Sequence, residues 1–130
     1  MNNLYARCVF FVRDADESRA FYTERLGFSL DWDFREDGRT EVCQVSLFGF
    51  ELILNRVHDR TSDRAGHGRA FVGLDDGQRE PLREHLSSRS ITARRVDWGR
   101  PTLVLEDPDR NELFFWLPGD DLSGFELASS

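Results

Sequence analysis

The sequence has few cysteines and no long apolar run. Its two cysteines, Cys8 and Cys43, lie within apolar stretches and lack C-x-x-C spacing, so neither a disulfide framework nor a cysteine-based zinc site is predicted. We expect buried thiols in a reducing, cytoplasmic environment. No apolar run approaches the ~20 residues that span a bilayer. No charged-then-apolar leader precedes the first apolar stretch, so neither secretion nor a membrane partner is predicted.

Basic residues are outnumbered by acidic ones. Seventeen Lys and Arg residues against 24 Asp and Glu give a formal net charge of −7, which opposes binding to nucleic acid. Several catalytic motifs are missing as well. The chain has no glycine-rich phosphate loop and no G-x-S-x-G elbow, and neither cysteine has a histidine beside it in the sequence. Phosphate-loop, serine-hydrolase and thiolate chemistry therefore find no support.

Apolar and aromatic residues are plentiful by contrast. Hydrophobic residues make up 39% of the 130 residues and include eleven Phe and three Trp, which predicts one folded domain spanning residues 1–130. Apolar alternation and turn residues predict the secondary structure. The predicted strands cover residues 4–12, 28–34, 42–47, 50–54, 69–74, 91–96, 103–106 and 113–117, with helices over 16–26 and from about 77–80 to 88.

The order of these elements occurs twice. Each half reads βαβββ, and Arg7 and the run Val12-Arg13-Asp14 of the first half correspond to Arg69 and Leu74-Asp75-Asp76 of the second. This duplication predicts an α+β fold of two modules. The first module covers residues 4–54, a polar linker covers 55–68, the second module covers 69–117, and a short acidic tail at 118–130 is expected to fray.

The predicted hairpin over residues 102–117 closes the second module. Asp107-Pro108-Asp109 places a proline at the first central position of a turn, with carboxylates that can accept from nearby backbone N–H groups. Alternation along the last strand separates its side chains into two sets, both largely apolar. One set is Glu112, Phe114 and Trp116, and the other is Leu113, Phe115 and Leu117. We therefore expect this strand to be covered on both faces.

Two stretches resemble a known superfamily. They are Val12-Arg13-Asp14 through Ser18-Arg19-Ala20-Phe21-Tyr22 to Leu26-Gly27-Phe28, and Glu106-Asp107-Pro108-Asp109-Arg110-Asn111-Glu112-Leu113. With the duplicated βαβββ order, they are similar to the vicinal oxygen chelate superfamily of glyoxalase I, fosfomycin-resistance enzymes, ring-cleaving dioxygenases and bleomycin-resistance proteins. The resemblance implies that the paired modules form a cupped mixed sheet around a cavity. It also implies a homodimer whose subunits both contribute walls.

The resemblance also identifies where metal ligands would stand. Metal-dependent members take His and Glu from four strand positions, which correspond here to Arg7, Glu51, Arg69 and Phe114. Arginine is permanently protonated and offers no lone pair, so this set is not expected to hold a metal, and no cofactor is implied. His58, His67 and His85 are conceivable substitutes, but their charged and polar neighbours predict surface positions.

The same cup is predicted to carry a ligand. Two roles remain open for Arg7, Glu51 and Arg69: a structural ion cluster, or a clamp in which one guanidinium grips an anionic or carbonyl-bearing ligand. Strand parity and the position of the tryptophans predict an apolar lining around them. It consists of Val9, Phe11, Ile53, Phe71, Phe114 and Trp116, with Trp32 and Trp98 as stacking walls.

These features favour a metal-independent small-molecule binding protein, closest in character to the bleomycin-resistance branch, with antibiotics among the candidate ligands. The acidic balance suits a cationic drug, whereas Arg7 and Arg69 do not. The alternative is an enzyme on the same fold, either a glyoxalase-type lyase or isomerase or a dioxygenase, that uses Glu51 as a general base or a metal at another position. A third possibility is a filled cavity and a protein that acts only through partners.

Overall fold

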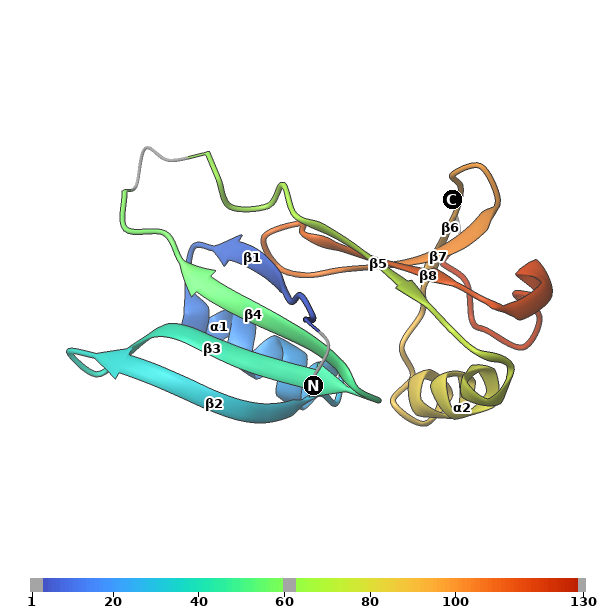
Figure 1. Ribbon diagram of the computed structural model, residues 1–130, viewed down its shortest axis with the longest axis horizontal. Coiled ribbons are helices and arrows are strands. Elements are labelled where there is room, and N and C mark those ends of the chain that lie inside the picture. Colours follow the sequence, from blue (N-terminus) through green and yellow to red (C-terminus); the bar gives the residue numbers. More distant parts are fainter. Residues whose placement is uncertain (1–3, 60–62, 129–130) are drawn as a thin grey trace.

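The computed structural model describes residues 4–59 and 63–128, and within them the predicted α+β architecture of two βαβββ modules is confirmed (Figure 1). The first module forms a sheet in the order β1-β4-β3-β2, and the second forms a separate sheet in the order β5-β8-β7-β6. In each sheet the first strand runs parallel to the last, and the other pairs are antiparallel. The two modules therefore repeat one topology.

The bounds of the elements differ from the sequence predictions mainly at their ends. The first module contains β1 Cys8–Val12, α1 Ala15–Ala20, a π-helical turn Phe21–Arg25, β2 Ser29–Glu36, β3 Arg39–Leu47 and β4 Phe50–Arg56. The second contains β5 Arg69–Gly73, a 3-10 turn Asp76–Gln78, α2 Arg79–Ser88, β6 Arg94–Asp97, β7 Pro101–Glu106 and β8 Glu112–Trp116. A last 3-10 turn covers Pro118–Asp120.

Each helix begins where the sequence predicts. The Asp14 side chain caps α1 by accepting from the backbone N–H groups of Asp16 and Glu17. The helix that follows is not regular, because the turn after Ala20 is π-helical and closes with Leu26 N–H donating to the Phe21 carbonyl. In the second module, Asp75 and Gln78 form a capping box in front of α2.

Each sheet has one face covered by helix and protein core. The α1 helix lies behind the first sheet and α2 lies below the second (Figure 1). The covered faces contribute to a single hydrophobic core that draws on both modules. From the first sheet it takes Phe10, Val12, Cys43, Val45, Leu52 and Leu54, and from the second Leu103, Leu105, Leu113, Phe115 and Leu117. The opposite faces of both sheets are left without a helix.

Long side chains of each module donate to backbone carbonyls of the other. The Arg25 guanidinium donates to the carbonyls of Arg89 and Ser90 at 2.7 and 3.1 Å, and Arg89 donates in return to the Glu24 carbonyl at 3.2 Å. His85 Nε2 donates to the Leu26 carbonyl at 2.7 Å. These contacts join the end of the first helical segment to the end of α2. We call them the carbonyl junction.

A second junction is buried at the β7–β8 turn. The predicted proline turn is confirmed, with Arg110 N–H donating to the Asp107 carbonyl at 2.9 Å. The Asp107 carboxylate also accepts from the Tyr22 hydroxyl at 3.2 Å and the Asn111 side-chain amide at 3.1 Å. Burial raises the pKa of Asp107, and hydrogen bonds from Asn111 oppose that shift. Burial, with the nearby Asp107 charge, also holds the pKa of Tyr22 well above its usual value.

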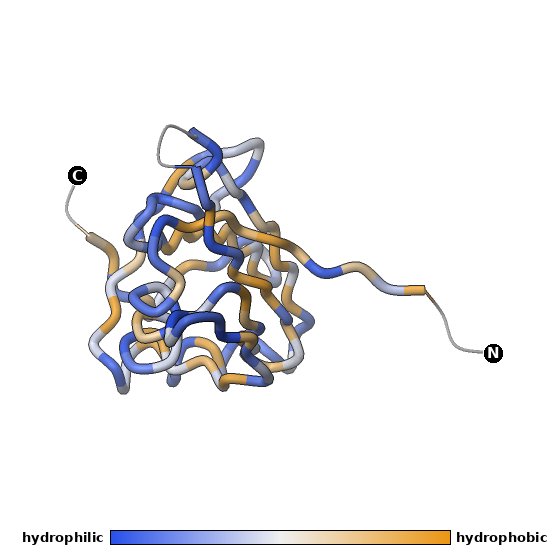
Figure 2. The backbone as a smooth tube through the Cα atoms, turned by 90° about the vertical axis from the view of Figure 1, so that its left-hand side faces the viewer, coloured by the Kyte–Doolittle hydropathy of each residue, from blue (hydrophilic) through white to orange (hydrophobic). Residues whose placement is uncertain are grey.

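Both ends of the described chain correct the sequence predictions. Residues 4–7 are not part of β1, and Figure 2 shows them standing away from the body of the molecule. The tail, expected to fray, is held instead. The Arg79 guanidinium donates to the carbonyls of Asp121 and Ser123, and Ala128 N–H donates to the Ala93 carbonyl at 2.8 Å. Residues 129–130 of the predicted tail lie outside the described residues.

The linker is shorter than predicted, because β4 continues to Arg56. Residues 60–62 of the predicted linker lie outside the described residues. Within the described ranges, none of the helices has the length and apolar character needed to cross a membrane.

Candidate ligand-binding surface

The residues predicted to line a cup lie on the open faces of the two sheets. Alternation along each strand sends one set of side chains to the core and the next set to the uncovered face. Phe10 and Val12 of β1 are buried in the core, whereas Val9 on the opposite face is 44% exposed. Phe71 of β5 and Trp32 of β2 are likewise 41% and 40% exposed. The face that strand parity predicted for Val9 and Phe71 agrees with the structure, and Trp32, predicted as a stacking wall, lies on the open face of its own sheet.

Four aromatic rings gather on the open face of the second sheet. Phe71, Phe114 and Trp116 come from neighbouring strands, and Trp98 joins them from the turn between β6 and β7. The centroids of Phe71 and Trp98 are 4.5 Å apart, those of Phe71 and Phe114 4.9 Å, and Trp98 stacks on Trp116 at 6.0 Å. The Trp116 indole N–H donates to Thr102 Oγ1 at 3.1 Å, which fixes its ring. We call these four residues the aromatic cluster.

Two guanidinium groups lie over rings of the aromatic cluster. Arg69 Cζ is 5.0 Å from the centroid of Phe114, and Arg100 Cζ is 5.1 Å from that of Trp116. Arg69 also donates to Glu112 at 3.0 Å, and Arg94 donates to the other oxygen of the same carboxylate at 2.7 Å. The second sheet therefore presents flat apolar surface with cationic groups along its border.

The open face of the first sheet is more polar. Val9, Phe11 and Ile53 lie side by side on β1 and β4, and Trp32 on β2 lies opposite Gln44 on β3. Next to them is a hydrogen-bonded network of four polar side chains. Arg7 donates to Gln44 Oε1 at 2.8 Å, and Gln44 Nε2 donates to Glu51 at 3.0 Å and to Asp31 at 2.9 Å. Gln44 is buried at the centre of this network.

Within one chain, Arg69 does not join Arg7 and Glu51. Arg7 Nε lies 3.8 Å from the Glu51 carboxylate, but Arg69 pairs with Glu112 instead. The strand register explains these pairs. Arg69 lies directly opposite Glu112 in the second sheet. In the first sheet the paired residues begin with Cys8 and Leu52, and Arg7 and Glu51 each come one residue earlier. Each module therefore neutralises its own arginine, and neither carboxylate is free of an arginine partner.

The same register corrects the fourth metal position. Glu112, rather than Phe114, is the counterpart of Glu51 in the second module, since each lies beside the arginine at the start of the parallel strand. Phe114 lies opposite Phe71 and belongs to the aromatic cluster. Phe114, which was predicted to replace a metal ligand, is therefore a residue of the aromatic cluster instead.

The donor atoms on the open faces do not suit a metal ion. Across residues 4–59 and 63–128, no group of three or more His, Cys, Asp or Glu side chains is placed to hold one. The carboxylates that could serve as metal ligands, Glu51 and Glu112, each face an arginine, and a guanidinium repels cations. Of the three histidines, His58 pairs with Glu41 and His67 is exposed. His85 is not a surface residue as predicted but is partly buried in the carbonyl junction.

Four functional candidates escaped sequence prediction. Gln44 and Asp31 complete the network around Glu51, and Arg94 and Arg100 complete the cationic border of the aromatic cluster. Alternation along β3 places Gln44 on the same face as Val42 and Ser46, which is the signal that identifies it. Arg100 lies in a turn, where no periodicity fixes the direction of a side chain.

The two open faces do not meet within one chain. The four rings of the aromatic cluster belong to the second sheet and the turn before β7, whereas Val9, Phe11, Trp32 and Ile53 belong to the first sheet. The predicted single cup is thus present as two half-surfaces of different character, one aromatic and cationic at its border, the other apolar with a polar network.

The model of the Glyoxalase/Bleomycin resistance protein/Dioxygenase superfamily matches residues 5–115, which include the first module and all of the second except Trp116, the last residue of β8. The chain belongs to this superfamily. No curated protein matches it. Solved structures with the fold of this superfamily include the antibiotic-binding protein TnmS3 from Streptomyces sp. CB03234, with 21% identity over 91% of this chain and 99% of that one and a TM-score of 0.56.

Two further solved structures support the same fold. The bleomycin-binding protein from bleomycin-producing Streptomyces verticillus, complexed with copper(II)-bleomycin, shares 18% identity over 88% of this chain and 96% of its own, with a TM-score of 0.62. A glyoxalase/bleomycin resistance protein/dioxygenase from Alicyclobacillus acidocaldarius shares 23% identity over 88% and 91%, with a TM-score of 0.59. The chain described here is thus a member of the superfamily with arginine-paired carboxylates in both modules and an aromatic cluster in the second.

Proposed function

We propose that this superfamily member binds an organic small molecule with a planar aromatic part, without a metal ion and without transforming it. The observation that carries the proposal is the aromatic cluster of Phe71, Trp98, Phe114 and Trp116 on a sheet face that no helix covers. Trp98 is 46% exposed, although a buried aromatic ring contributes much more stability than an exposed one. A planar ligand would bury this ring surface.

The charged border of the cluster suggests the polar part of the ligand. The Cζ atoms of Arg69 and Arg100 lie within about 5 Å of ring centroids of the cluster, and each guanidinium carries five N–H donors, of which Arg69 uses Nε on Glu112 and Arg100 uses Nε on Asp120. Such donors suit carbonyl, phenolate or carboxylate oxygens attached to an aromatic system. The names of the neighbours agree with this class, because TnmS3 is described as antibiotic-binding and another neighbour as bleomycin-binding. An aromatic antibiotic is therefore the ligand class we propose.

A homodimer would complete the site. Val9, Trp32 and Phe34 on one open face, and Phe71 and Trp98 on the other, are all at least 40% exposed, and apolar patches of this kind mark interaction sites. A two-fold axis that places the first sheet of one chain over the second sheet of its partner covers both faces. Each cavity would then combine an aromatic half from one subunit with a polar network from the other.

Intrinsic tryptophan fluorescence provides the test, because two of the three tryptophans belong to the aromatic cluster. Purified protein treated with EDTA is titrated with bleomycin, 2-naphthoate and an anthraquinone antibiotic. Trp98→Ala is the main variant, since Trp98 lies in an exposed turn and its loss leaves the strands intact. Loss of one stacking ring, about 1 to 2 kcal/mol, weakens binding about five- to thirtyfold.

Phe125→Leu is the matched control, because Phe125 stacks with Arg79 away from both open faces. It should leave affinity unchanged. Sedimentation equilibrium at micromolar concentration should show a dimer. The proposal is abandoned if Trp98→Ala binds every responsive probe as tightly as the wild type, if binding requires an added divalent metal, or if a monomer binds with full affinity.

A further inference from the structure

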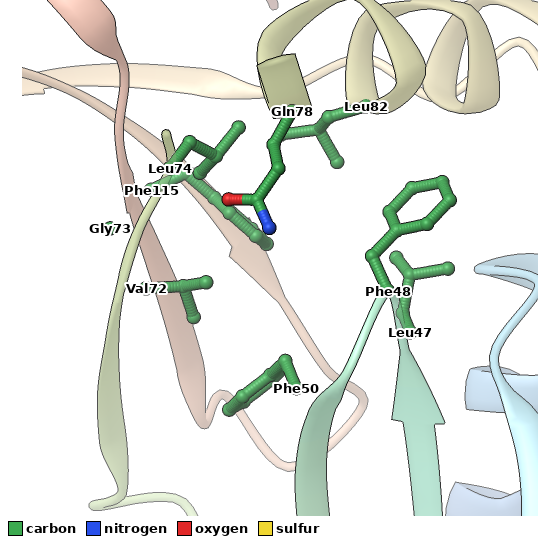
Figure 3. Close-up of a pocket in the computed structure, with 9 residues that line it drawn as sticks. All are labelled: Leu47, Phe48, Phe50, Val72, Gly73, Leu74, Gln78, Leu82 and Phe115. Carbon is green, nitrogen blue, oxygen red and sulfur yellow. The ribbon is translucent and has the colours of Figure 1, made fainter. Parts of the chain in front are cut away.

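A cavity of about 220 Å³ lies where the two modules meet, away from both open faces (Figure 3). Leu47 and Phe50 of the first module form one wall, and Val72, Leu82 and Phe115 of the second form the other. We propose that this cavity is a second small-molecule site, and that it takes an uncharged single-ring aromatic compound bearing a hydrogen-bond acceptor such as a carbonyl. We call it the junction cavity.

The size of the cavity limits the ligand. An engineered apolar cavity of roughly 150 Å³ in another protein stays dry and binds benzene, while pockets for drug-sized ligands begin near ~300 Å³. The junction cavity falls between these volumes at about 220 Å³. It therefore has room for one substituted ring and not for a glycopeptide or a fused antibiotic, which separates its ligand from the one proposed for the open faces.

The lining of the cavity fixes the charge of the ligand. Seven of the nine lining residues have apolar side chains, one is glycine, and Gln78 is the sole polar side chain among these nine. Burying a charged group without a counter-charge is far more costly than burying an apolar one. An ionised ligand is thus disfavoured, and an uncharged ring is favoured.

Gln78 supplies one directed hydrogen-bond donor. Its Oε1 accepts from the Asp75 backbone N–H at 2.9 Å, and this bond settles which end of the amide is oxygen. The amide nitrogen then points into the cavity, as Figure 3 shows. Within the described part of the chain, this nitrogen donates to no protein group. A carbonyl or ether oxygen on the ligand would accept from it.

Phe48 at the rim provides an independent indication. It occupies the first position of the two-residue turn Phe48-Gly49 between β3 and β4, with φ of 49°. Asn, Asp or Gly normally fills this position, because a bulky side chain is strained there. The ring is nevertheless 55% exposed and packs edge-on against His85 at 5.7 Å. Strained residues of this kind cluster at ligand sites, and a bound ring would bury the exposed face of Phe48.

Methyl NMR of selectively labelled protein tests the proposal with two probes of similar shape. Acetophenone carries a carbonyl acceptor, and ethylbenzene does not. Both should shift the methyl resonances of Val72, Leu74 and Leu82, which line the cavity. Acetophenone should bind about fivefold more tightly, because one neutral hydrogen bond contributes ~1 kcal/mol. Trp98→Ala should leave both affinities unchanged, so failure here is distinct from failure of the open-face site.

Gln78→Glu isolates the donor. The glutamate keeps an oxygen for the Asp75 N–H and preserves the capping box, but it loses the amide hydrogens. The preference for acetophenone over ethylbenzene should disappear. Val72→Phe fills the cavity and should abolish binding of both probes, whereas Val72→Ile, the conservative control, should keep both. If Val72→Phe does not fold, Gln78→Glu at the exposed start of α2 decides the question alone.

Three outcomes would overturn the proposal. The first is the absence of methyl shifts in the wild type at the solubility limit of both probes, which is also the result expected if a second copy of the chain covers the cavity mouth. The second is equal affinity for acetophenone and ethylbenzene. The third is binding that persists in folded Val72→Phe.

Discussion

Replacement of Asn111 by alanine should destabilise the protein more than any single change on the open faces. Asn111 is fully buried and joins three separate segments of the chain. Its Oδ1 accepts from Gly68 N–H at 2.8 Å, and its Nδ2 donates to the Phe11 carbonyl and the Asp107 carboxylate, both at 3.1 Å. It therefore ties the end of the linker and the first strand of one module to the β7–β8 turn of the other.

The expected magnitude follows from the groups left behind. Asn111→Ala leaves a partly buried N–H of Gly68, a partly buried carbonyl of Phe11 and the buried Asp107 carboxylate each short of one partner, at ~1 to 3 kcal/mol apiece before water partly replaces the amide. We expect a loss of about 3 to 5 kcal/mol in the free energy of unfolding. For a chain of this length, that loss lowers the melting temperature by about 10 to 20 °C.

Urea denaturation followed by circular dichroism, together with calorimetry, measures this loss. Asn55→Ala is the matched control, because Asn55 is the penultimate residue of β4, on its open side, and its side chain makes no hydrogen bond among the described residues. It should change the free energy of unfolding by less than about 0.5 kcal/mol. If Asn111→Ala costs less than about 1 kcal/mol, the buried junction does not hold the modules together and the reasoning fails.

Three further predictions concern titrating and charged groups. Burial raises the pKa of Cys43 to about 11, so Ellman's reagent at pH 8 should label this thiol only after unfolding. Cys8 is only partly buried, so rapid labelling of one thiol in native protein is compatible with the prediction and rapid labelling of both contradicts it. Burial and the Asp107 charge raise the pKa of Tyr22 in the folded protein. The free energy of unfolding should therefore not depend on this group below about pH 10 and should decrease above it. Urea titrations of Tyr22→Phe at several pH values should show a smaller decrease. Arg7→Ala should lower the free energy of unfolding by about 1 to 2 kcal/mol. The 3.8 Å pair with Glu51 contributes little because it is about one-third exposed on each side, and most of the loss comes from the hydrogen bond to the buried Gln44, so a loss above about 3 kcal/mol in calorimetry would refute this estimate.

The sequence predicted the repeat and the faces, because both follow from short-range patterns. A strand has a period of two residues, so Phe71, Phe114 and Trp116 had to share a face once their strands were identified. The turn at Pro108 and the start of α2 near Pro81 were predicted for a similarly local reason, since proline fixes its own backbone angle. Each of these features depends on neighbours within a few residues.

The partners of the arginines required information that local patterns do not contain. Arg69 meets Glu112 through the register of two parallel strands far apart in the chain, and a shift of that register by one pair would have placed Phe114 beside it instead. Periodicity also predicts which residues share a face of a strand, but it does not predict how two sheets are placed relative to each other. The prediction of one cup therefore placed Val9 and Phe71 on a common wall, whereas the structure puts them on separate sheets.

The junction cavity and the tail were missed for a further reason. The cavity forms where the hairpin turn at Phe48 meets α2, and the sequence pattern of neither element predicts that the two are in contact. The tail is polar by composition, which predicted fraying, but the Arg79 guanidinium holds it by donating to the backbone carbonyls of Asp121 and Ser123. Such contacts use backbone atoms, to which composition is blind.

The carbonyl junction has a consequence for the evolution of this chain. Arg25, Arg89 and His85 must retain their donors, yet the carbonyls that receive them, such as those of Glu24 and Ser90, would be supplied by any amino acid. The residues that supply these carbonyls can thus be substituted without weakening the attachment of one module to the other. Correlated substitution would leave little trace at this interface, even though it governs how the two halves are oriented.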